Sequence, residues 1–463
     1  MKEGFPLNDM TLFDSFFLDA PTSVNVDAIR YHWQSLEPHY NVGDWMLPLP
    51  PWRHHGYSDS GQAAWNILQH DLSQTDSGKP FCIYLHTPFC SRKCNFCDSY
   101  SFKLGSHQTE RIQDYVDRLC YELRLWSRQG NLSQRPVSTV HLGGGTPTFL
   151  GGAALRQITD CCRECFSVSP ETEWALESTV NELTPEITDV LHELGYRRLH
   201  IGIQTLEPQV RETIGRLRHP VAALDVIERT LALDWVVSVD LICGLPYQTL
   251  TGFMDAIEIL MDIGVNGFSI YELLVYPQNR RWCKQYGLTA PSRHQFNYWM
   301  FVAGALLLES RGFTKNLFNH WADTQDTNIY FTFPIRGEDL LAVGTIADGV
   351  FGNYHYRHPS YARYMKHSQD GLPGLEGGLR HDTAFDVIQP FVKGIQASRI
   401  SGQVVHEAKS NFSGMSALMD RWMTCELINH NGNDGLKLTA SGSWFAGNLI
   451  ADLTAFLVEK PIF

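Results

Sequence analysis

The stretch FCIYLHTPFCSRKCNFC, residues 81–97, joins an apolar and aromatic run to three closely spaced cysteines. Its first part, FCIYLHTP (81–88), has the length and composition of a buried β-strand. Segments with helical spacing recur after it, among them 112–126, 154–166, 186–195 and 253–264. They alternate with five more strand-like runs: VSTVHLGGG (137–145), EWALEST (173–179), RRLHIGIQ (197–204), VVSVDLICGLP (236–246) and GFSIYELLV (267–275). This alternation predicts parallel strands joined by right-handed helical crossovers.

Six strand–helix units predict an α/β fold, and they favour a partial (β/α)6 TIM-like barrel over a flat doubly wound sheet. In either case the chemistry should collect at the carboxyl ends of the strands. We assign the barrel to residues 81–275. Residues 1–80 form an acidic, aromatic lead-in that could cover one mouth of the barrel, and residues 276–463 form a second, mainly helical domain.

The composition of the chain limits the kinds of binding partner and the cellular location that we expect. The 463 residues include 37 Lys and Arg against 50 Asp and Glu, a net charge of −13, which argues against a nucleic-acid partner and favours a small or neutral one. No run of 18 apolar residues and no signal-peptide pattern is present, so we expect a cytoplasmic protein without a membrane span. Eleven cysteines, an odd number, favour reduced thiols or metal ligands over disulfides.

Three cysteines with the spacing CxxxCxxC, Cys90, Cys94 and Cys97, carry the strongest chemical signal. Three thiolates on one loop can bind three irons of a 4Fe-4S cluster and leave the fourth iron open. A zinc site is the alternative, and it would need a further ligand such as His86 or His107. The second group, CCREC (161–165), lies in a helical pattern, so we interpret Cys161, Cys162 and Cys165 as buried thiols.

Several motifs together resemble the radical S-adenosylmethionine (SAM) superfamily, and within it the oxygen-independent coproporphyrinogen III oxidase-like subgroup. The cysteine loop after the first strand of a (β/α)6 barrel is the signature of that superfamily. Motifs typical of the subgroup follow in the expected order: YLHTPFCSRKCNFC (84–97), GGGTPT (143–148), HIGIQTLEP (200–208), DLICGLPYQT (240–249), LAVGTIADG (341–349) and LKLTASG (436–442). The resemblance implies a 4Fe-4S cluster and SAM as cofactors.

The resemblance also implies roles for individual residues. Cys90, Cys94 and Cys97 would ligate the cluster, and Phe96 would pack beside it. The methionyl group of SAM would lie near Tyr84 and the backbone of Gly144, Gly145 and Thr146. The residues that would contact the amino, carboxylate or ribose groups of SAM are Glu177, Gln204, Arg216 and Asp240.

Within the subgroup, GTIADGVFGNYHYRHPSY (344–361) and LTASGSWFAGNL (438–449) look most like the class C radical SAM methyltransferases. That likeness implies two SAM molecules in one cavity, methylation of an sp2 carbon, and a one-electron donor such as a flavodoxin or ferredoxin. A base must accept the ring proton, and our candidates are Tyr271, Tyr354, His355 and His358. We expect a planar aromatic substrate, with menaquinone (ring C8) favoured because a neutral, apolar ring suits an acidic chain rich in aromatics.

Two other functions stay open. An oxidase acting on a substrate with four propionates should offer several Arg or Lys, yet the lead-in has four basic against ten acidic residues, and Asp98 and Ser99 follow Cys97 where that oxidase typically carries a further cysteine. Asp98 is more like a heme chaperone or a heme-degrading relative. A lipid substrate would require transient membrane contact, and FDSFFLD (13–19) could supply it, although we favour a helix that packs in the core.

Overall fold

A computed structural model describes most of the chain: residues 10–36, 40, 42–43, 45–48, 57–105, 108–216, 218–290, 292–366, 374–381, 383–432 and 434–459. Six parallel strands form its centre, in the spatial order β2 (Phe81–Thr87), β5 (Val137–Gly144), β6 (Glu173–Ser178), β7 (Arg198–Gln204), β8 (Val236–Cys243) and β9 (Gly267–Glu272). All six predicted strands are confirmed. They are largely buried, as strands covered on both faces must be.

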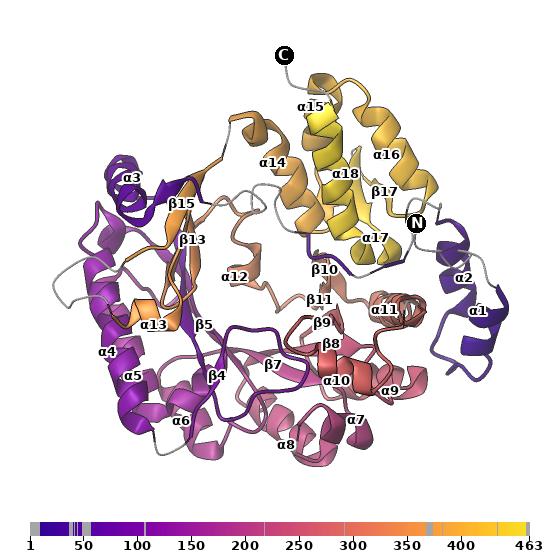
Figure 1. Ribbon diagram of the computed structural model, residues 1–463, viewed down its shortest axis with the longest axis horizontal. Coiled ribbons are helices and arrows are strands. Elements are labelled where there is room, and N and C mark those ends of the chain that lie inside the picture. The colour runs from indigo at the N-terminus through magenta and orange to yellow at the C-terminus, as the bar shows by residue number, and fades with distance from the viewer. Residues whose placement is uncertain are drawn as a thin grey trace.

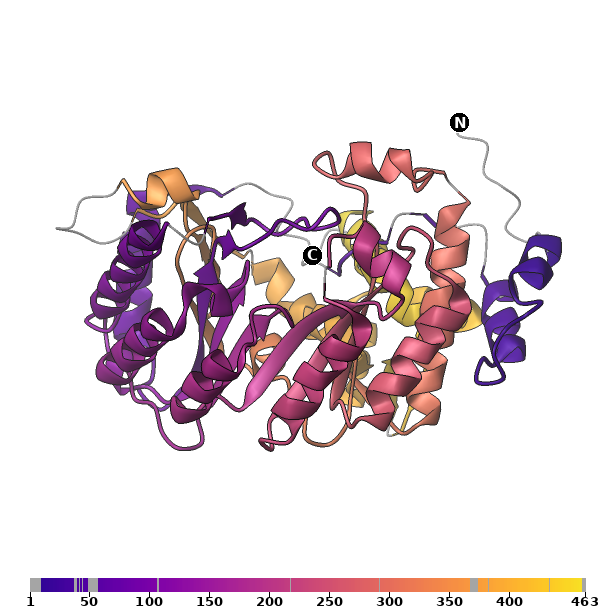
Figure 2. The same ribbon diagram turned by 90° about the horizontal axis from the view of Figure 1, so that it is seen from below.

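Helices connect these strands on the outer side of the sheet (Figures 1 and 2). Thr184 and Thr249 cap two of them through their side-chain oxygens, and Pro185 begins the first of these at the position that tolerates proline. The predicted helices are confirmed. The connecting elements are α4 (Thr109–Trp126), η3 (Leu132–Gln134), η4 (Pro147–Leu150), α5 (Gly152–Cys165), α6 (Pro185–Glu193), α7 (Pro208–Thr213), α8 (Pro220–Leu231) and α9 (Leu250–Asp262).

The sheet continues beyond the six central strands and crosses both predicted boundaries, at residues 80 and 275. β12 (Asp339–Val343) pairs parallel with β2, and β11 (His320–Ala322) pairs antiparallel with β9. The pattern after residue 276 did not predict these strands, because they are short. Among the described residues the sheet has thirteen strands, and the others are β13 (Asp348–Phe351), β14 (Tyr354–Arg357), β15 (Gly377–Arg380), β1 (Asp59–Ser60) and β10 (Thr314–Leu317).

The C-terminal segment is mainly helical, as predicted. Its last helices surround a small sheet and form the yellow group in Figure 1. In the described part of the chain, no helix is long and apolar enough to cross a membrane. The helices are α10 (Arg280–Gln285), α11 (Arg293–Ser310), α12 (Ile329–Thr332), α13 (Tyr361–Tyr364), α14 (Thr383–Gln396), α15 (Gly402–Asn411), α16 (Met415–Thr424), α17 (Ala440–Trp444) and α18 (Ala446–Glu459); the small sheet comprises β16 (Arg399–Ile400), β17 (Ile428–Asn431) and β18 (Gly435–Leu438).

The lead-in contributes α1 (Met10–Phe16), α2 (Val26–Gln34) and α3 (Gly61–Gln74). α1 and α2 lie against α11 at one end of the molecule (Figure 2). Phe13 and Phe16, from the predicted segment 13–19, contact the ring of Trp299 in α11. This segment therefore packs in the core.

Residues 45–48, which we call the strap, hold the lead-in against the barrel. The backbone N–H of Trp45 donates a hydrogen bond of 2.8 Å to the buried carboxylate of Glu272, the last residue of β9. At the other end of the strap, Gln396 Nε2 donates to the carbonyl of Pro48 at 2.7 Å. The lead-in thus reaches the carboxyl ends of the barrel strands, where the sequence predicts the chemistry.

Candidate active site

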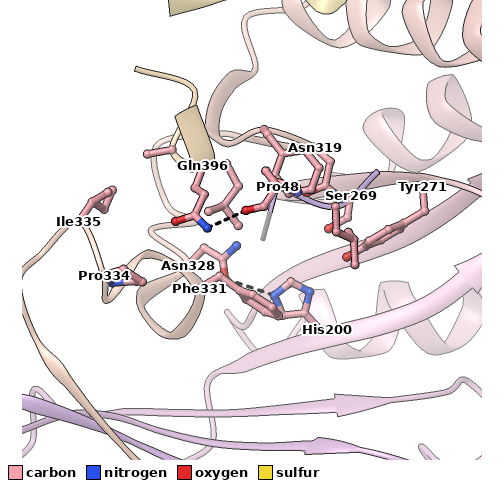
Figure 3. A pocket seen from close by; sticks show the side chains of 14 residues that line it. Pro48, His200, Ser269, Tyr271, Asn319, Asn328, Phe331, Pro334, Ile335 and Gln396 are labelled. Carbon is pink, nitrogen blue, oxygen red and sulfur yellow. Dashed lines mark hydrogen bonds between the residues drawn. The ribbon is translucent and has the colours of Figure 1, made fainter. Parts of the chain in front are cut away.

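Three adjoining cavities lie at the carboxyl ends of the strands. The cysteine cavity, about 210 Å³, is lined by the three cysteines of the predicted cluster loop. The central cavity, about 260 Å³, adjoins it through Gln204 and Asp240. The outer cavity, about 390 Å³ (Figure 3), adjoins the central one through Tyr271 and Leu47, and it shares His200 with the cysteine cavity.

The cysteine loop runs between two short paired strands, β3 (Phe89–Cys90) and β4 (Phe102–Lys103). Thr146 Oγ1 lies 3.5 Å from the sulfur of Cys90. Lys93 Nζ lies 3.7 Å from the sulfur of Cys97, and it is fixed by a 2.5 Å hydrogen bond to the carbonyl of Ser99. Burial raises the pKa of the Cys97 thiol, and the Lys93 cation partly offsets this effect in favour of the thiolate that an iron requires.

The glycines at the carboxyl end of β5 form a wall of exposed backbone. Gly144 has φ +105°, and its N–H donates to Glu177 at 3.0 Å. A Cβ at Gly144 would lie 2.5 Å from the ring of His86, and one at Gly143 would lie 2.6 Å from Glu177. Only glycine fits these positions, so the run is more than an ordinary tight turn.

Glu177 and Asp240 are carboxylates with opposite behaviour in the same site. Burial alone would raise the pKa of Glu177, but hydrogen bonds from His141 and the Gly144 N–H bring it below its ordinary value. Burial and the nearby Glu177 charge raise the pKa of Asp240 to about 7. One carboxylate therefore stays ionised while the other titrates near neutrality.

Gln204 and Arg216 direct unsatisfied polar atoms toward the cysteine cavity. The chain bulges between Gly202 and Gln204 of β7, where Gln204 takes φ +68°. In the described part of the chain, Gln204 Oε1 and Arg216 Nε are buried without a hydrogen-bond partner. A polar ligand would remove this cost.

The structure brings nearly all the predicted cofactor residues together. The exception is Tyr84, which lines none of the three cavities: its hydroxyl contacts His86 Nδ1 at 3.1 Å and its ring stacks on Tyr330. The predicted residues that line the cysteine cavity are Cys90, Cys94, Phe96, Cys97, Gly144, Gly145, Thr146, Glu177, Gln204, Arg216 and Asp240.

Tyr271 is the one predicted base that lies at the cavities. Tyr354 is fully buried, and its hydroxyl donates to Asp59 at 2.9 Å. His355 stacks on His381, and His358 forms a buried 2.5 Å pair with Glu122. These three residues belong to or follow β14, which β12 and β13 separate from β2, and none of them lines a cavity described here.

The geometry supports neither a zinc site at the cysteine loop nor a second metal site at Cys161, Cys162 and Cys165. The ring of His86 is held by Tyr84 and by the carbonyl of Tyr100, while His107 lies outside the described residues. Cys161, Cys162 and Cys165 are buried on α5, as predicted. Among the described residues, no three His, Cys, Asp or Glu side chains converge on a single metal ion. A cluster does not need such convergence, because each thiolate binds a different iron.

Sequence reasoning missed several residues of the outer cavity. His200 and Ser269 come from β7 and β9, Asn328 and Phe331 from the loop and helix α12, and Gln396 from α14 (Figure 3). Burial, the charge of Arg198 and the nearby His320 push the pKa of His200 well below its ordinary value, so the ring is neutral. Only the period-two alternation of HIGIQ and FSIYE could have placed His200 and Ser269 on the inner face.

Residues 84–277 match the family model of the radical SAM superfamily. This part of the chain has the radical SAM fold and is similar to that superfamily. Radical SAM domains use a 4Fe-4S cluster and SAM, and the three thiols, exposed glycine backbone and unsatisfied polar atoms of the cysteine cavity fit both groups.

Relatives match beyond this domain. Anaerobilin synthase of Escherichia coli O157:H7 is 25% identical over 416 residues, 85% of this chain and 90% of that protein. The heme chaperone HemW of Bacillus subtilis is 30% identical, over 42% of this chain and 51% of its own length. An oxygen-independent coproporphyrinogen III oxidase of Salmonella typhimurium is 28% identical, over 43% of each protein. The chain thus spans about half the length of the latter two relatives.

The fold itself has a solved counterpart. The coproporphyrinogen III oxidase HemN from Escherichia coli superposes with a TM-score of 0.73 over 88% of this chain and 98% of its own, at 19% identity. The radical SAM domain and the elements that follow it therefore share one fold with that enzyme. The predicted partial barrel with a helical C-terminal segment is confirmed.

Proposed function

We propose that the protein is a radical SAM C-methyltransferase that acts on an sp2 carbon of a planar conjugated ring, and that this ring is a heme-type tetrapyrrole. The observation that carries the proposal is the outer cavity, which adjoins the cysteine cavity at His200. Among the described residues that line it, none is Lys, Arg, Asp or Glu. The aromatic ring of Phe331 and the side chains of Leu47 and Ile335 stay exposed at its wall.

Large exposed apolar side chains that gather at one cavity are typical of a ligand site. Flat rings can stack on Phe331, and carboxamides of Asn319, Asn328 and Gln396 offer hydrogen bonds without a net charge. The names of the relatives point to tetrapyrroles, namely heme, coproporphyrinogen and a bilin. Menaquinone, which composition favoured, is the second candidate because its ring is also planar and uncharged. Coproporphyrinogen suits this cavity less than heme, because it carries four carboxylates where heme carries two, and each carboxylate favours a cation beside it.

In this proposal Cys90, Cys94 and Cys97 hold the cluster, and Gly144, Glu177, Gln204, Arg216 and Asp240 bind and orient SAM. When bound, these groups supply a one-electron cleavage of SAM that yields a hydrogen-abstracting radical. The chain orients the reacting carbons and excludes water from them. Trp45 and Leu47 of the strap line the central cavity together with Tyr271, where they would help to exclude water from the reacting carbons. Electrons come from a donor such as a flavodoxin or ferredoxin.

The test is anaerobic turnover of the reconstituted protein with SAM and a reductant, with hemin and menaquinone in parallel. We expect 5′-deoxyadenosine and S-adenosylhomocysteine in equal amounts, together with a hemin-derived product heavier by one methylene unit. The Cys94→Ala variant, which loses a cluster ligand, should form none of these products. Its matched control is Cys162→Ser, a buried thiol remote from the cavities, which should keep the iron content and the products.

Other results would point elsewhere. Methylated menaquinone with unchanged hemin would move the proposal to the second substrate. Deoxyadenosine without S-adenosylhomocysteine would contradict methyl transfer and favour the oxidase. Tight hemin binding without consumption of SAM would favour a chaperone.

A further inference from the structure

The hydroxyl of Ser269 links the cavities to a buried histidine. Ser269 lies on β9 at the wall of the outer cavity, next to Tyr271 (Figure 3). Its side chain lowers the pKa of Tyr271 and of Asp240, both of which line the central cavity. Its Oγ also lies 2.8 Å from Nδ1 of His320, a residue of β11 that is 1% exposed.

His320 in turn contacts a buried carboxylate. Nε2 of its ring lies 2.8 Å from Oδ2 of Asp326. Arg198 lies 2.6 Å from the other oxygen of Asp326, and Ser238 donates a hydrogen bond of 2.7 Å to the same carboxylate. Although burial raises the pKa of Asp326, the charges of His320 and Arg198 hold it well below its usual range.

This arrangement fixes the tautomer of His320. An ionised carboxylate can only accept hydrogen bonds, so Nε2 must carry the ring proton that points to Asp326. When the ring carries this proton alone, Nδ1 is an acceptor and Ser269 donates to it. In the order hydroxyl, imidazole, carboxylate, the imidazole can take the proton of the hydroxyl, and the carboxylate stabilises the imidazolium that forms.

We propose that Ser269, His320 and Asp326 form a proton relay that serves the substrate in the outer cavity. The inference rests on the proposed function. In a C-methylation the ring carbon that forms the new C–C bond loses a proton, and the C–S bond of the methyl donor breaks to release S-adenosylhomocysteine. The CH2 radical that remains on the ring carbon then takes one electron, from a donor of the flavodoxin or ferredoxin class, and one proton, and it becomes the new methyl group.

The relay handles both proton transfers. Ser269 Oγ takes the ring proton as its own proton passes to His320 Nδ1, which leaves an imidazolium beside Asp326. The reverse transfer delivers a proton to the CH2 carbon and restores the neutral ring. Ser269 is therefore the residue that touches substrate, and His320 and Asp326 act through it.

Two other groups at the cavities suit this role less. The ring of His200 is kept neutral, and its Nε2 is already engaged by Arg198 at 3.1 Å. Burial, aided by the Asp240 charge, raises the pKa of Tyr271, so its phenol keeps its proton. Through Ser269 the outer cavity reaches His320, a proton acceptor whose charged form the carboxylate of Asp326 stabilises.

The first test compares Ser269→Ala with Ser441→Ala. Ser441 is also buried and hydrogen-bonds to a tyrosine, Tyr298, but it lines none of the three cavities. We expect Ser269→Ala to form 5′-deoxyadenosine while its methylated product falls by about 10²-fold, as for loss of a general base. Ser441→Ala should keep the wild-type ratio, and Ser269→Thr, which retains the hydroxyl, should recover most of it. A wild-type ratio in Ser269→Ala would overturn the relay.

The second test needs no turnover, so it separates failure of the relay from failure of the proposed function. Nitrogen-15 NMR of histidine-labelled protein reports the tautomer of each ring, and the signals of His320 are those lost in His320→Gln. We expect a neutral ring protonated at Nε2, with an Nδ1 shift that changes in Ser269→Ala and not in Ser441→Ala. A proton on Nδ1 in the wild type would refute the relay whatever the substrate proves to be.

Discussion

At the residue scale, the site contains a buried carboxylate, Asp240, whose ionisation lowers the stability of the folded protein. The folded pKa of Asp240, about 7, lies above its ordinary value of 3.8 because burial and Glu177 disfavour the charge. The folded protein therefore holds this proton more tightly than the unfolded chain. Stability contributed by the protonated form is present below pH 3.8 and is lost as the pH rises to about 7.

Asp240→Asn should accordingly make the SAM-free protein more stable above pH 7. Asparagine cannot ionise, so the gain should be full there and should shrink toward pH 3.8. Thermal unfolding across this range checks it, with Asp255→Asn on an exposed part of α9 as the control. The same variant should bind SAM more weakly. A stability gain that is independent of pH would contradict the assignment of the charge to Asp240.

At the element scale, α4, β14 and α13 are joined behind the sheet by one buried carboxylate. Glu122 accepts hydrogen bonds from His358 at 2.5 Å, from Tyr364 at 2.6 Å and from Trp126 at 3.0 Å. Against the effect of burial, the Glu122 charge raises the pKa of His358, and His358 lowers that of Glu122. The histidine that sequence reasoning offered as a base is here one half of an ion pair.

His358→Gln should lower the free energy of unfolding by about 3 kcal/mol, because it leaves a buried charge without its partner. Because folding lowers the pKa of Glu122, the stability that Glu122 contributes is present above pH 4.5. Because folding raises the pKa of His358, the stability that His358 contributes is full below pH 6.5. The loss should therefore be greatest between these values and smaller in alkali. Urea unfolding measures it. Unchanged stability with lost methylation would instead restore His358 as a catalytic base.

At the scale of the whole molecule, Glu272 joins three distant parts of the chain. It accepts hydrogen bonds of 2.8 Å from the Trp45 backbone, from His294 and from Asn297, so the lead-in, the barrel and α11 meet at one side chain. The ring of Trp45 also packs edge-on against Tyr271. Closure of the central cavity thus depends on residues more than two hundred positions apart.

Glu272→Ala should release the strap, because the Trp45 N–H loses its acceptor. We expect faster proteolysis near Trp45 and more 5′-deoxyadenosine for each methylated product, since water then reaches the site. Glu193→Ala removes an exposed carboxylate whose pair with Arg156 is a surface one, and it should change neither readout. Unchanged cleavage and unchanged coupling in Glu272→Ala would show that the strap is held by packing alone.

The sequence by itself determined the features that depend on local spacing. Strand periodicity predicted all six central strands, and the CxxxCxxC loop with its neighbouring motifs predicted the cysteine cavity, because ligands that are close in sequence on one loop must be close in space. Of the four candidate bases that the sequence offered, Tyr271 is the one that lines the cavities. The resemblance to the radical SAM superfamily implied SAM as a cofactor.

Tertiary structure alone decided which distant residues meet. The GNYHYRH motif suggested a site, but β14 pairs on the far side of β12 and β13, so Tyr354, His355 and His358 do not reach the cavities. The meeting of Ser269 with His320 and Asp326 gave no signal, because β11 follows β9 only after a long helical excursion and its antiparallel pairing with β9 places His320 opposite Ser269. Sequence spacing controls proximity within an element, whereas pairing of strands across the sheet controls proximity between elements, and no local pattern encodes it.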